Sequence, residues 1–251
     1  LIHLAGGIGQ VGDFTNYYKG NTSYFDPILW KNNKQNQYEG YCSDIFAENA
    51  IEFIEKNKNN SFFCYLSFNA PHTPLQVPEK YYNMYKDLNP ELGFSDDLSD
   101  FRMNEKDKED ARKIYGMVTN IDDNVGKVIN KLKELKIEKE TIIIFMTDNG
   151  PQQIRYNSSM KGRKGTVYNG GIRVPFYIQY SEKFKESKVI NKMSAHIDVL
   201  PTILELCNLN VPNDRKIDGQ SLVPFINSKS TNDRFLFSYW TRRFPEKYIN
   251  I

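Results

Sequence analysis

Three loops of this 251-residue chain carry side chains that could bind an ion or move a proton. The stretch TDNG at 147–150 pairs Asp148 with Asn149, and carboxylate and amide oxygens are ligands that Ca²⁺ and Mg²⁺ accept. The same letters are also favourable turn residues, because Asp, Asn and Gly tolerate the tight backbone of a turn. The residues alone therefore leave a cation site and a simple turn both open.

A basic, glycine-rich run follows at 158–171, with the sequence SSMKGRKGTVYNGG. It supplies Lys161, Arg163 and Lys164 among residues small enough for the backbone to approach a ligand closely. Ammonium and guanidinium groups in such a run could neutralise a sulfate or a phosphate. The run does not match the G-x-x-x-x-G-K-[ST] pattern of a P-loop, and a basic surface loop is the alternative.

The third loop is APHTPLQVP at 70–78, which places His72 between two prolines. A proline-stiffened loop presents an imidazole with little conformational freedom to lose, which suits proton transfer or anion binding. His196 instead opens a predicted helix, where capping or packing is the simpler role. Cation ligands, a histidine and a lysine together describe the chemistry of an anionic ester better than any of them does alone.

A glycine motif near the start of the chain is weaker evidence for a binding site. GIGQVG at 7–12 fits the dinucleotide-binding pattern G-x-G-x-x-G, which needs a strand before it and an amphipathic helix after it. The preceding LIHLA is short, and the following DFTNYYKG has no helical apolar stripe. We therefore interpret 7–12 as a glycine turn.

The composition excludes several classes of protein. The net charge of +2 gives no reason to expect nucleic acid or an anionic membrane as partner, and no apolar run could span a bilayer. Three cysteines are too few and too scattered for a disulfide framework or a zinc site, and Cys64 is expected to be a buried thiol. The chain opens LIHLAGG without an initiator Met, so we expect it to be a piece of a longer protein.

Helices are predicted where apolar residues recur at spacings of three and four. The clearest helix is 106–136, in which Ile114, Val118, Ile121 and Val125 fall on one face. Further helices are expected over 43–57, 78–87 and 196–208, with loops over 1–44 and 88–104.

Short apolar runs predict strands at 61–68, 141–148, 174–180 and 235–240. Strands alternating with helices indicate an α/β fold with a mostly parallel central sheet flanked by helices. In such sheets the carboxyl ends of the strands share one edge, so the loops 70–78 and 147–171 should converge there.

These segments together resemble the formylglycine-dependent sulfatases, arylsulfatase-like members of the alkaline-phosphatase superfamily. The matching strings run in the family's order from about residue 38 to 240: FFCYLSFNAPHTPLQVP, YGMVTNIDDNVGKVINKL, TIIIFMTDNGP, RYNSSMKGRKGTVYNGGIRVPF, AHIDVLPTILEL and DGQSLVPF. The resemblance implies a sulfatase fold that is incomplete at both ends. Residues 1–210 would be the central part of the catalytic α/β domain, and 211–251 would lead into a truncated small C-terminal subdomain.

The resemblance also implies roles for the candidate residues. Asp148 and Asn149 would supply half of a divalent-cation site, usually Ca²⁺ in this family. Lys164 would contact the substrate sulfate, and His72 would lie near the sulfate and the leaving oxygen. Arg155 would line the substrate pocket together with Tyr156, although a packing role suits both equally well. The implied reaction is hydrolysis of a sulfate ester by a hydrated formylglycine, with a sulfated glycan as the expected substrate.

Parts of the family's pattern are missing from this chain. No Cys or Ser begins the Cys/Ser-x-Pro-x-Arg string that holds the family's nucleophile, and the acidic pair that completes the metal site is absent. We expect the formylglycine and the remaining ligands upstream, and the fragment alone to be inactive. Asn169 stands where many relatives carry Glu, which leaves open any supporting role of that acid.

Two other functions fit the same residues. One is a phosphoester or phosphonate hydrolase of the same superfamily, and the other is a catalytically dead relative that binds sulfated glycans. The sulfatase interpretation implies a formylglycine-maturing enzyme as partner. It also brings a periplasmic, extracellular or lysosomal location, by resemblance alone.

Overall fold

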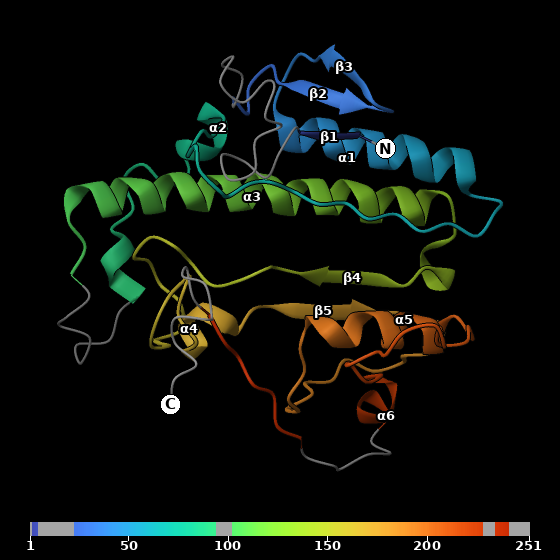
Figure 1. The fold of residues 1–251 in the computed structure, drawn as a ribbon. Coiled ribbons are helices and arrows are strands. Elements are labelled where there is room, and N and C mark those ends of the chain that lie inside the picture. The colour runs from blue at the N-terminus through green and yellow to red at the C-terminus, as the bar shows by residue number, and fades with distance from the viewer. Residues whose placement is uncertain (1, 5–22, 94–101, 228–233, 241–251) are drawn as a thin grey trace. The chain divides into compact units, whose positions relative to one another are not determined.

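The computed structural model describes residues 2–4, 23–93, 102–227 and 234–240. Its chain forms two compact units, residues 1–182 and 183–251 (Figure 1). The glycine motif 7–12 lies outside the described residues, and the division predicted at 210 stays a prediction. No helix in the described ranges is long and apolar enough to cross a membrane.

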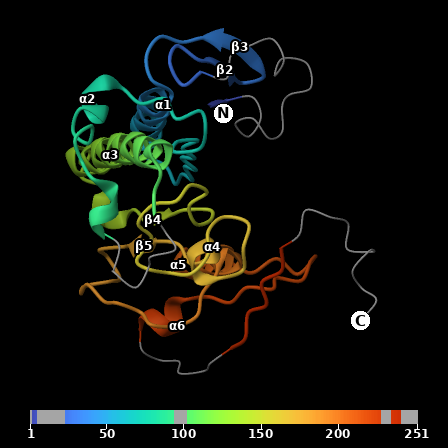
Figure 2. The same cartoon turned by 90° about the vertical axis from the view of Figure 1, so that its left-hand side faces the viewer.

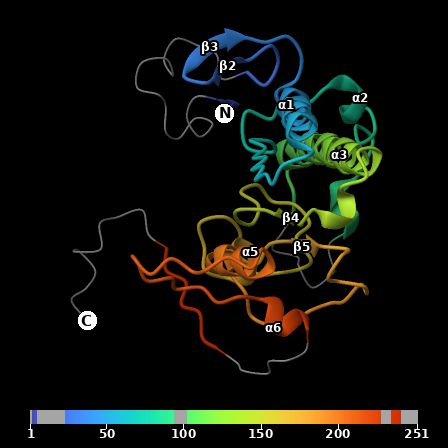
Figure 3. The ribbon, with the colours of Figure 1, turned by 90° about the vertical axis from the view of Figure 1, so that its right-hand side faces the viewer.

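Two helices form the centre of the first unit. Helix α1 (Cys42–Asn57) and helix α3 (Glu105–Glu134) lie side by side in every view (Figures 1, 2 and 3). Helix α3 begins where the Asn104 side chain accepts a hydrogen bond from the Asp107 N–H at 2.9 Å. They confirm the predicted helices at 43–57 and 106–136, but Val118, predicted on the apolar face of α3, is 46% exposed.

The core of the first unit lies along these helices. Its buried members are Tyr24, Leu29, Tyr41, Cys42, Ile45, Phe46, Ala70, Met117 and Ile121. Removing such side chains from water contributes roughly 1.5–3 kcal/mol for each large apolar residue, before the entropy cost of ordering them. Ala70 belongs to the same cluster, so the loop that carries His72 starts on the core.

A small antiparallel sheet occupies part of the region expected to be a loop. Strands β1 (Ile2–Leu4), β2 (Ile28–Lys31) and β3 (Lys34–Gln37) pair in that order. Asn32 and Asn33 join the last two with positive φ angles of 52° and 64°, as a two-residue hairpin of this kind requires. The prediction of a loop over 1–44 was wrong here, because strands of three or four residues are too short to show a period.

Strands β4 (Ile143–Met146) and β5 (Phe176–Gln179) confirm the predicted strands at 141–148 and 174–180. They pair antiparallel, with Ile143 opposite Gln179 and Met146 opposite Phe176. All ladders in the described part of the chain are antiparallel, whereas the sequence favoured mostly parallel pairs. The segment 147–175 that joins β4 to β5 contains only the four-residue helix α4 (Asn169–Ile172) and not the longer helix that usually connects two parallel strands.

The segment 61–68 forms no strand, contrary to prediction. Leu66 and Phe68 pack against the core, but Phe63 and Tyr65 are 72% and 75% exposed. Alternate side chains thus face opposite ways, as in a strand, while the described residues provide no ladder partner. Cys64 is accordingly only half-buried, and the fully buried thiol is that of Cys42.

The remaining helices are short. The predicted helix 78–87 contracts to the single turn α2 (Glu79–Tyr82), and a 3-10 turn at Pro90–Gly93 lies inside the predicted loop 88–104. A second 3-10 turn, Glu138–Glu140, precedes β4.

The second unit is built around a buried carboxylate. A 3-10 turn at His196–Asp198 runs into α5 (Val199–Leu206), which confirms the predicted helix, and α6 (Val223–Ile226) follows. The Asp198 carboxylate accepts hydrogen bonds from the Ala195 N–H at 2.8 Å and the Gln220 N–H at 2.9 Å, and pairs with Arg234. The segment 235–240, predicted as a strand, follows that arginine without a ladder, and Phe235 and Phe237 are largely exposed.

Candidate active site

The segment 147–175 folds back on itself through backbone hydrogen bonds. The Gly150 N–H donates to the Gly171 carbonyl at 2.9 Å, and the Lys164 N–H donates to the Pro151 carbonyl at 2.8 Å. The Gly170 N–H donates to the Lys161 carbonyl at 2.7 Å. These crossings hold the end of β4, with Asp148 and Asn149, in the same folded loop as Lys164.

Glycine is required where two backbone segments of this loop cross. A Cβ atom at Gly150 would lie 1.8 Å from the Gly170 carbonyl oxygen, and one at Gly170 would lie 2.1 Å from the Gly162 carbonyl oxygen. Because the atoms met are backbone atoms, no side-chain rotation could relieve the overlap. The Gly-rich composition is therefore what allows the basic run to lie against the TDNG turn.

Asp148 and Asn149 offer oxygen ligands at the head of this loop. The Asp148 carboxylate is exposed, and its Oδ1 atom accepts a hydrogen bond from the Asn149 N–H at 2.8 Å. The other carboxylate oxygen and the Asn149 amide oxygen make a donor pair that suits a hard cation such as Ca²⁺. In the described ranges no group of three or more His, Cys, Asp or Glu residues could hold a metal. The pair fits as part of a ligand set that needs further donors.

The three basic residues of the loop differ in their surroundings. The Lys161 ammonium lies 4.4 Å from the centre of the Tyr168 ring, so a cation–π contact engages it. The Arg163 side chain is exposed. Lys164 is half-buried and forms no ion pair with any described residue. The anion-binding role of Lys164 beside the TDNG turn stays a prediction.

Arg155 is a second cation without a carboxylate partner among the described residues. Its Nη1 atom donates to the Gln153 amide oxygen at 3.3 Å. Burial lowers the pKa of the guanidinium from its ordinary value, and the neighbouring Tyr115 of α3 raises it. Tyr156, next in the chain, is 51% exposed while its backbone contacts Tyr115. A partly desolvated guanidinium of this kind can bind an anion strongly.

His72 is half-buried in a loop bracketed by the cis peptide bonds Ala70–Pro71 and Thr73–Pro74. The ring Nδ1 lies 2.9 Å from the Thr73 carbonyl oxygen. A carbonyl can only accept a hydrogen bond, so this contact places a proton on Nδ1, and the Thr73 hydroxyl lies 3.3 Å from the same nitrogen. The convergence of His72 with Asp148 and Lys164 stays a prediction.

Sequence reasoning missed the residues that hold the His72 loop in place. The Tyr24 hydroxyl donates to the His72 carbonyl at 3.1 Å, and the Tyr24 N–H donates to the Gln76 side-chain oxygen at 2.6 Å. The Tyr41 hydroxyl donates to the Gln76 carbonyl at 2.9 Å. No local sequence pattern connects these tyrosines with a loop that lies tens of residues further along the chain.

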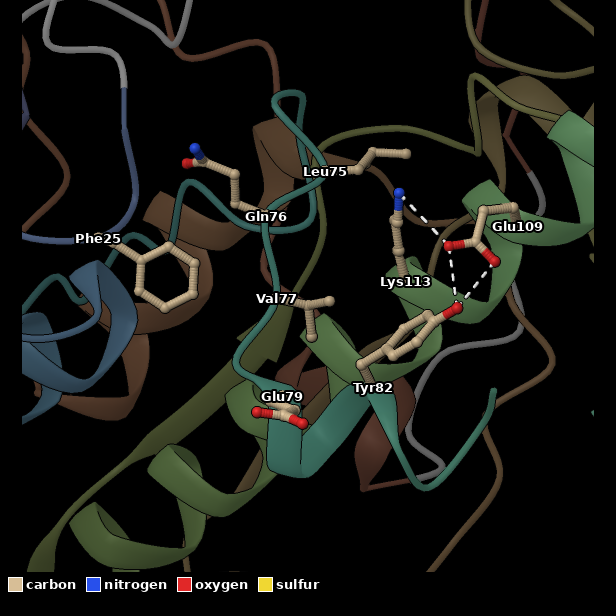
Figure 4. A pocket seen from close by; sticks show the side chains of 8 residues that line it. All are labelled: Phe25, Leu75, Gln76, Val77, Glu79, Tyr82, Glu109 and Lys113. Atoms are coloured by element: carbon tan, nitrogen blue, oxygen red, sulfur yellow. Dashed lines mark hydrogen bonds and ion pairs between the residues drawn. The ribbon is translucent and has the colours of Figure 1, made fainter. Parts of the chain in front are cut away.

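A hollow of about 410 Å³ lies beside the same loop (Figure 4). Its lining residues are Phe25, Leu75, Gln76, Val77, Glu79, Tyr82, Glu109 and Lys113. Figure 4 shows the Phe25 ring on one side and a polar group on the other. In that group the Tyr82 hydroxyl donates to Glu109 at 3.0 Å, and Lys113 pairs with Glu109 at 3.4 Å.

Comparisons with known proteins identify the family of the chain. The sulfatase family model matches residues 7–209. An arylsulfatase of Clostridium perfringens is 28% identical over 256 residues, covering 90% of this chain and 52% of that protein. The crystal structure of Ps i-CgsB in complex with k-i-k-neocarrahexaose has 29% identity and a TM-score of 0.68, covering 80% of this chain and 42% of that one.

The fold alone is shared with a phosphonate monoester hydrolase of Agrobacterium radiobacter, at 21% identity and a TM-score of 0.61, over 76% of this chain and 43% of that one. The chain spans 37% and 52% of the lengths of two curated sulfatase relatives. These likenesses confirm the α/β class and the sulfatase fold expected from the sequence. With most of its length matched by the family model, the chain belongs to the sulfatase family.

Proposed function

We propose that the protein containing this chain hydrolyses an organic sulfate ester. The observation that carries the proposal is the folded loop 147–175, in which backbone crossings bring Lys164 to the turn that bears Asp148 and Asn149. An anion-binding lysine beside two cation ligands suits a group that is itself an anion bound through several oxygens.

Each residue has a defined task in this reaction. The Lys164 ammonium binds a sulfuryl oxygen and stabilises the charge that grows on the group during attack. As an attacking oxygen forms its bond to sulfur, the bond between sulfur and the ester oxygen breaks, and that electron pair stays with the leaving oxygen. His72, protonated on Nε2, donates its proton to that oxygen. Asp148 and Asn149 would hold the divalent cation, which when bound supplies positive charge against the sulfuryl oxygens.

The nucleophile is expected from a segment that this chain does not contain. No string Cys/Ser-x-Pro-x-Arg occurs in the sequence, so a formylglycine would come from elsewhere in the protein. Its formation would make a formylglycine-maturing enzyme a partner, and a periplasmic, extracellular or lysosomal location goes with the same assignment.

The substrate class we propose is a sulfated glycan. One structural neighbour is solved with a bound neocarrahexaose. The hollow beside the His72 loop offers the Phe25 ring and the polar group of Tyr82, Glu109 and Lys113, a combination that suits a sugar ring. Arg155 would bind an anionic group of the same glycan. Phe25→Ala should raise KM for a sulfated oligosaccharide several-fold and leave KM for an aryl sulfate unchanged.

The test of the reaction is a comparison of two neighbouring basic residues in the full-length matured protein. Lys164→Ala should lower kcat/KM for sulfate esters by about 10²–10³, the usual cost of losing one oxyanion-stabilising group. Asp148→Ala should be at least as damaging. Arg163→Ala, one residue away but exposed, should stay within a few-fold of the wild type. Equal turnover by all four proteins would overturn the proposal.

A phosphonate or phosphate ester hydrolase is the second candidate, since a phosphonate monoester hydrolase shares the fold. Parallel assays with the phenyl esters of sulfate, phosphate and phosphonate decide between them by the ratio of kcat/KM values. Tight binding of a sulfated oligosaccharide without release of sulfate would instead identify a non-catalytic relative.

A further inference from the structure

The loop 70–78 needs external support to hold His72. It contains neither helix nor strand, and three of its nine residues are prolines, which donate no backbone hydrogen bond. Its own short-range bonds include the His72 N–H donating to Asn69 at 3.0 Å and the Gln76 N–H donating to Pro74 at 2.8 Å. These turn bonds shape the loop locally but do not fasten it to the rest of the molecule.

Two buried tyrosines supply that fastening. Tyr24 is 0% exposed and Tyr41 is 4% exposed, and their ring centres are 6.0 Å apart in the core. Tyr24 holds the loop at the His72 carbonyl and at the Gln76 side chain, while Tyr41 holds it at the Gln76 carbonyl. The loop is thus bound at the histidine itself and again four residues later.

The hydroxyls act as fixed donors. Burial raises the pKa of both tyrosines, and the neighbouring Cys42 adds to the effect in each. Both hydroxyls therefore keep their protons throughout the range in which an enzyme operates. Both hydrogen bonds are part-buried, so removing a hydroxyl deprives the accepting carbonyl of its buried donor.

We propose that Tyr24 is a positioning residue for His72, and that Tyr41 holds the other end of the same loop through Gln76. The inference rests on the proposed role of His72 as the proton donor to the leaving oxygen. Neither tyrosine touches substrate. Tyr24 fixes the backbone of His72, the Thr73 carbonyl fixes Nδ1, and together they determine where Nε2 delivers its proton.

The chemistry gives the inference a distinctive signature. A displacement of about 1 Å at a catalytic group can lower the rate by about 10². Because the displaced group here is the proposed proton donor, the step that slows is proton donation to the leaving oxygen. An ester whose leaving group is a stable anion needs little protonation, whereas an alkyl or sugar sulfate needs it fully. Loss of the Tyr24 hydroxyl should therefore slow the second kind of substrate far more than the first.

The experiment uses the full-length matured protein with Tyr24→Phe, which removes one oxygen and keeps the ring. We expect kcat for a sugar sulfate to fall about 10–100-fold, kcat for 4-nitrophenyl sulfate to fall less than about threefold, and KM to change little. Tyr81→Phe is the matched control. Tyr81 is 4% exposed, and its hydroxyl donates to Asp123 of α3 at 2.8 Å and not to the loop 70–78. It should leave the ratio between the two substrates unchanged.

A double-mutant cycle with His72→Ala tests the route of action. If Tyr24 acts through His72, Tyr24→Phe should cost nothing further in the His72→Ala background. An equal loss on both substrates, the same loss in Tyr81→Phe, or an undiminished loss without His72 would each overturn the inference.

A readout independent of turnover separates this inference from the proposed function. ¹⁵N NMR of the histidine ring should show the Nδ1–H tautomer for His72 in the wild type and a changed ring environment in Tyr24→Phe, with Tyr81→Phe unchanged. An inactive wild type with this NMR result would refute the sulfatase proposal and retain the positioning. Unchanged His72 signals in Tyr24→Phe would overturn the positioning whatever the activity.

Discussion

Replacing Gly150 by Ala is the sharpest test of the folded loop that carries the site. The added Cβ atom would lie 1.8 Å from the Gly170 carbonyl oxygen and 2.8 Å from its carbon. Cβ atoms essentially never approach closer than 3.0 Å, so the two backbones must separate by about 1.2 Å. The bond from Gly150 to Gly171 would lengthen with them. Asp148 and Lys164 would then lose their relative placement.

A misplacement of this size predicts a loss of about 10² in kcat/KM, with the core intact because Gly150 lies outside the core cluster. The assay is turnover of an aryl sulfate by the full-length protein, with thermal unfolding measured in parallel. The matched control is Gly126→Ala in α3, where nothing lies within 4 Å of the new Cβ atom. That change should preserve activity and stabilise the helix by about 0.5–1 kcal/mol. Activity of Gly150→Ala within threefold of the wild type would refute the argument that this crossing sets the site geometry.

Three further predictions concern stability and reactivity. Burial would raise the pKa of the Asp198 carboxyl, but hydrogen bonds from Arg234, Gln220 and Ala195 outweigh it and lower the pKa. Its contribution to stability is therefore present above about pH 4, the unfolded value, and is lost as the pH falls through the lower folded pKa. Asp198→Asn should lower the free energy of unfolding by about 3 kcal/mol at pH 7 and remove that acid dependence in denaturant titrations. Burial raises the pKa of the Cys42 thiol to about 12, so iodoacetamide at pH 8 should modify the exposed Cys207 and spare Cys42, as mass spectrometry would show. Asn104→Ala should cost about 1 kcal/mol in chemical denaturation by removing the cap of α3, and an unchanged midpoint would contradict the capping role.

The sequence predicted the elements whose signals are local. Helix α3 was recognisable because four turns or more of apolar spacing leave few alternatives, and α1 for the same reason. The hairpin of β2 and β3 was missed because each strand has only four residues. The segment 61–68 was misjudged because side-chain composition favours an extended chain, whereas a strand also needs a neighbour to accept its backbone hydrogen bonds.

The residues of the candidate site also fall into those that the sequence could predict and those that it could not. The sequence pointed to Asp148, Asn149 and Lys164 because a loop rich in Asp, Gly and Lys is recognisable as a candidate binding site from its residue types alone. Tyr24 and Tyr41 could not, since a tyrosine in a core looks the same whether its hydroxyl is incidental or holds a loop. Their partners, His72 and Gln76, are 48 and 35 residues away in the chain. Only the folded structure shows that these residues, distant in the sequence, are joined by hydrogen bonds.

The two loops of the proposed site are held in place by different interactions, and these interactions determine which substitutions harm each loop. In the loop 147–175 the backbone crosses itself at Gly150 and Gly170, so adding an atom at either glycine is harmful. In the loop 70–78 the backbone has little capacity to bond to itself, so removing a distant hydroxyl is harmful. Damage to the first loop should disturb the binding of the sulfate. Damage to the second should spare binding and slow the departure of poor leaving groups, so kcat and KM separate the two loops by experiment.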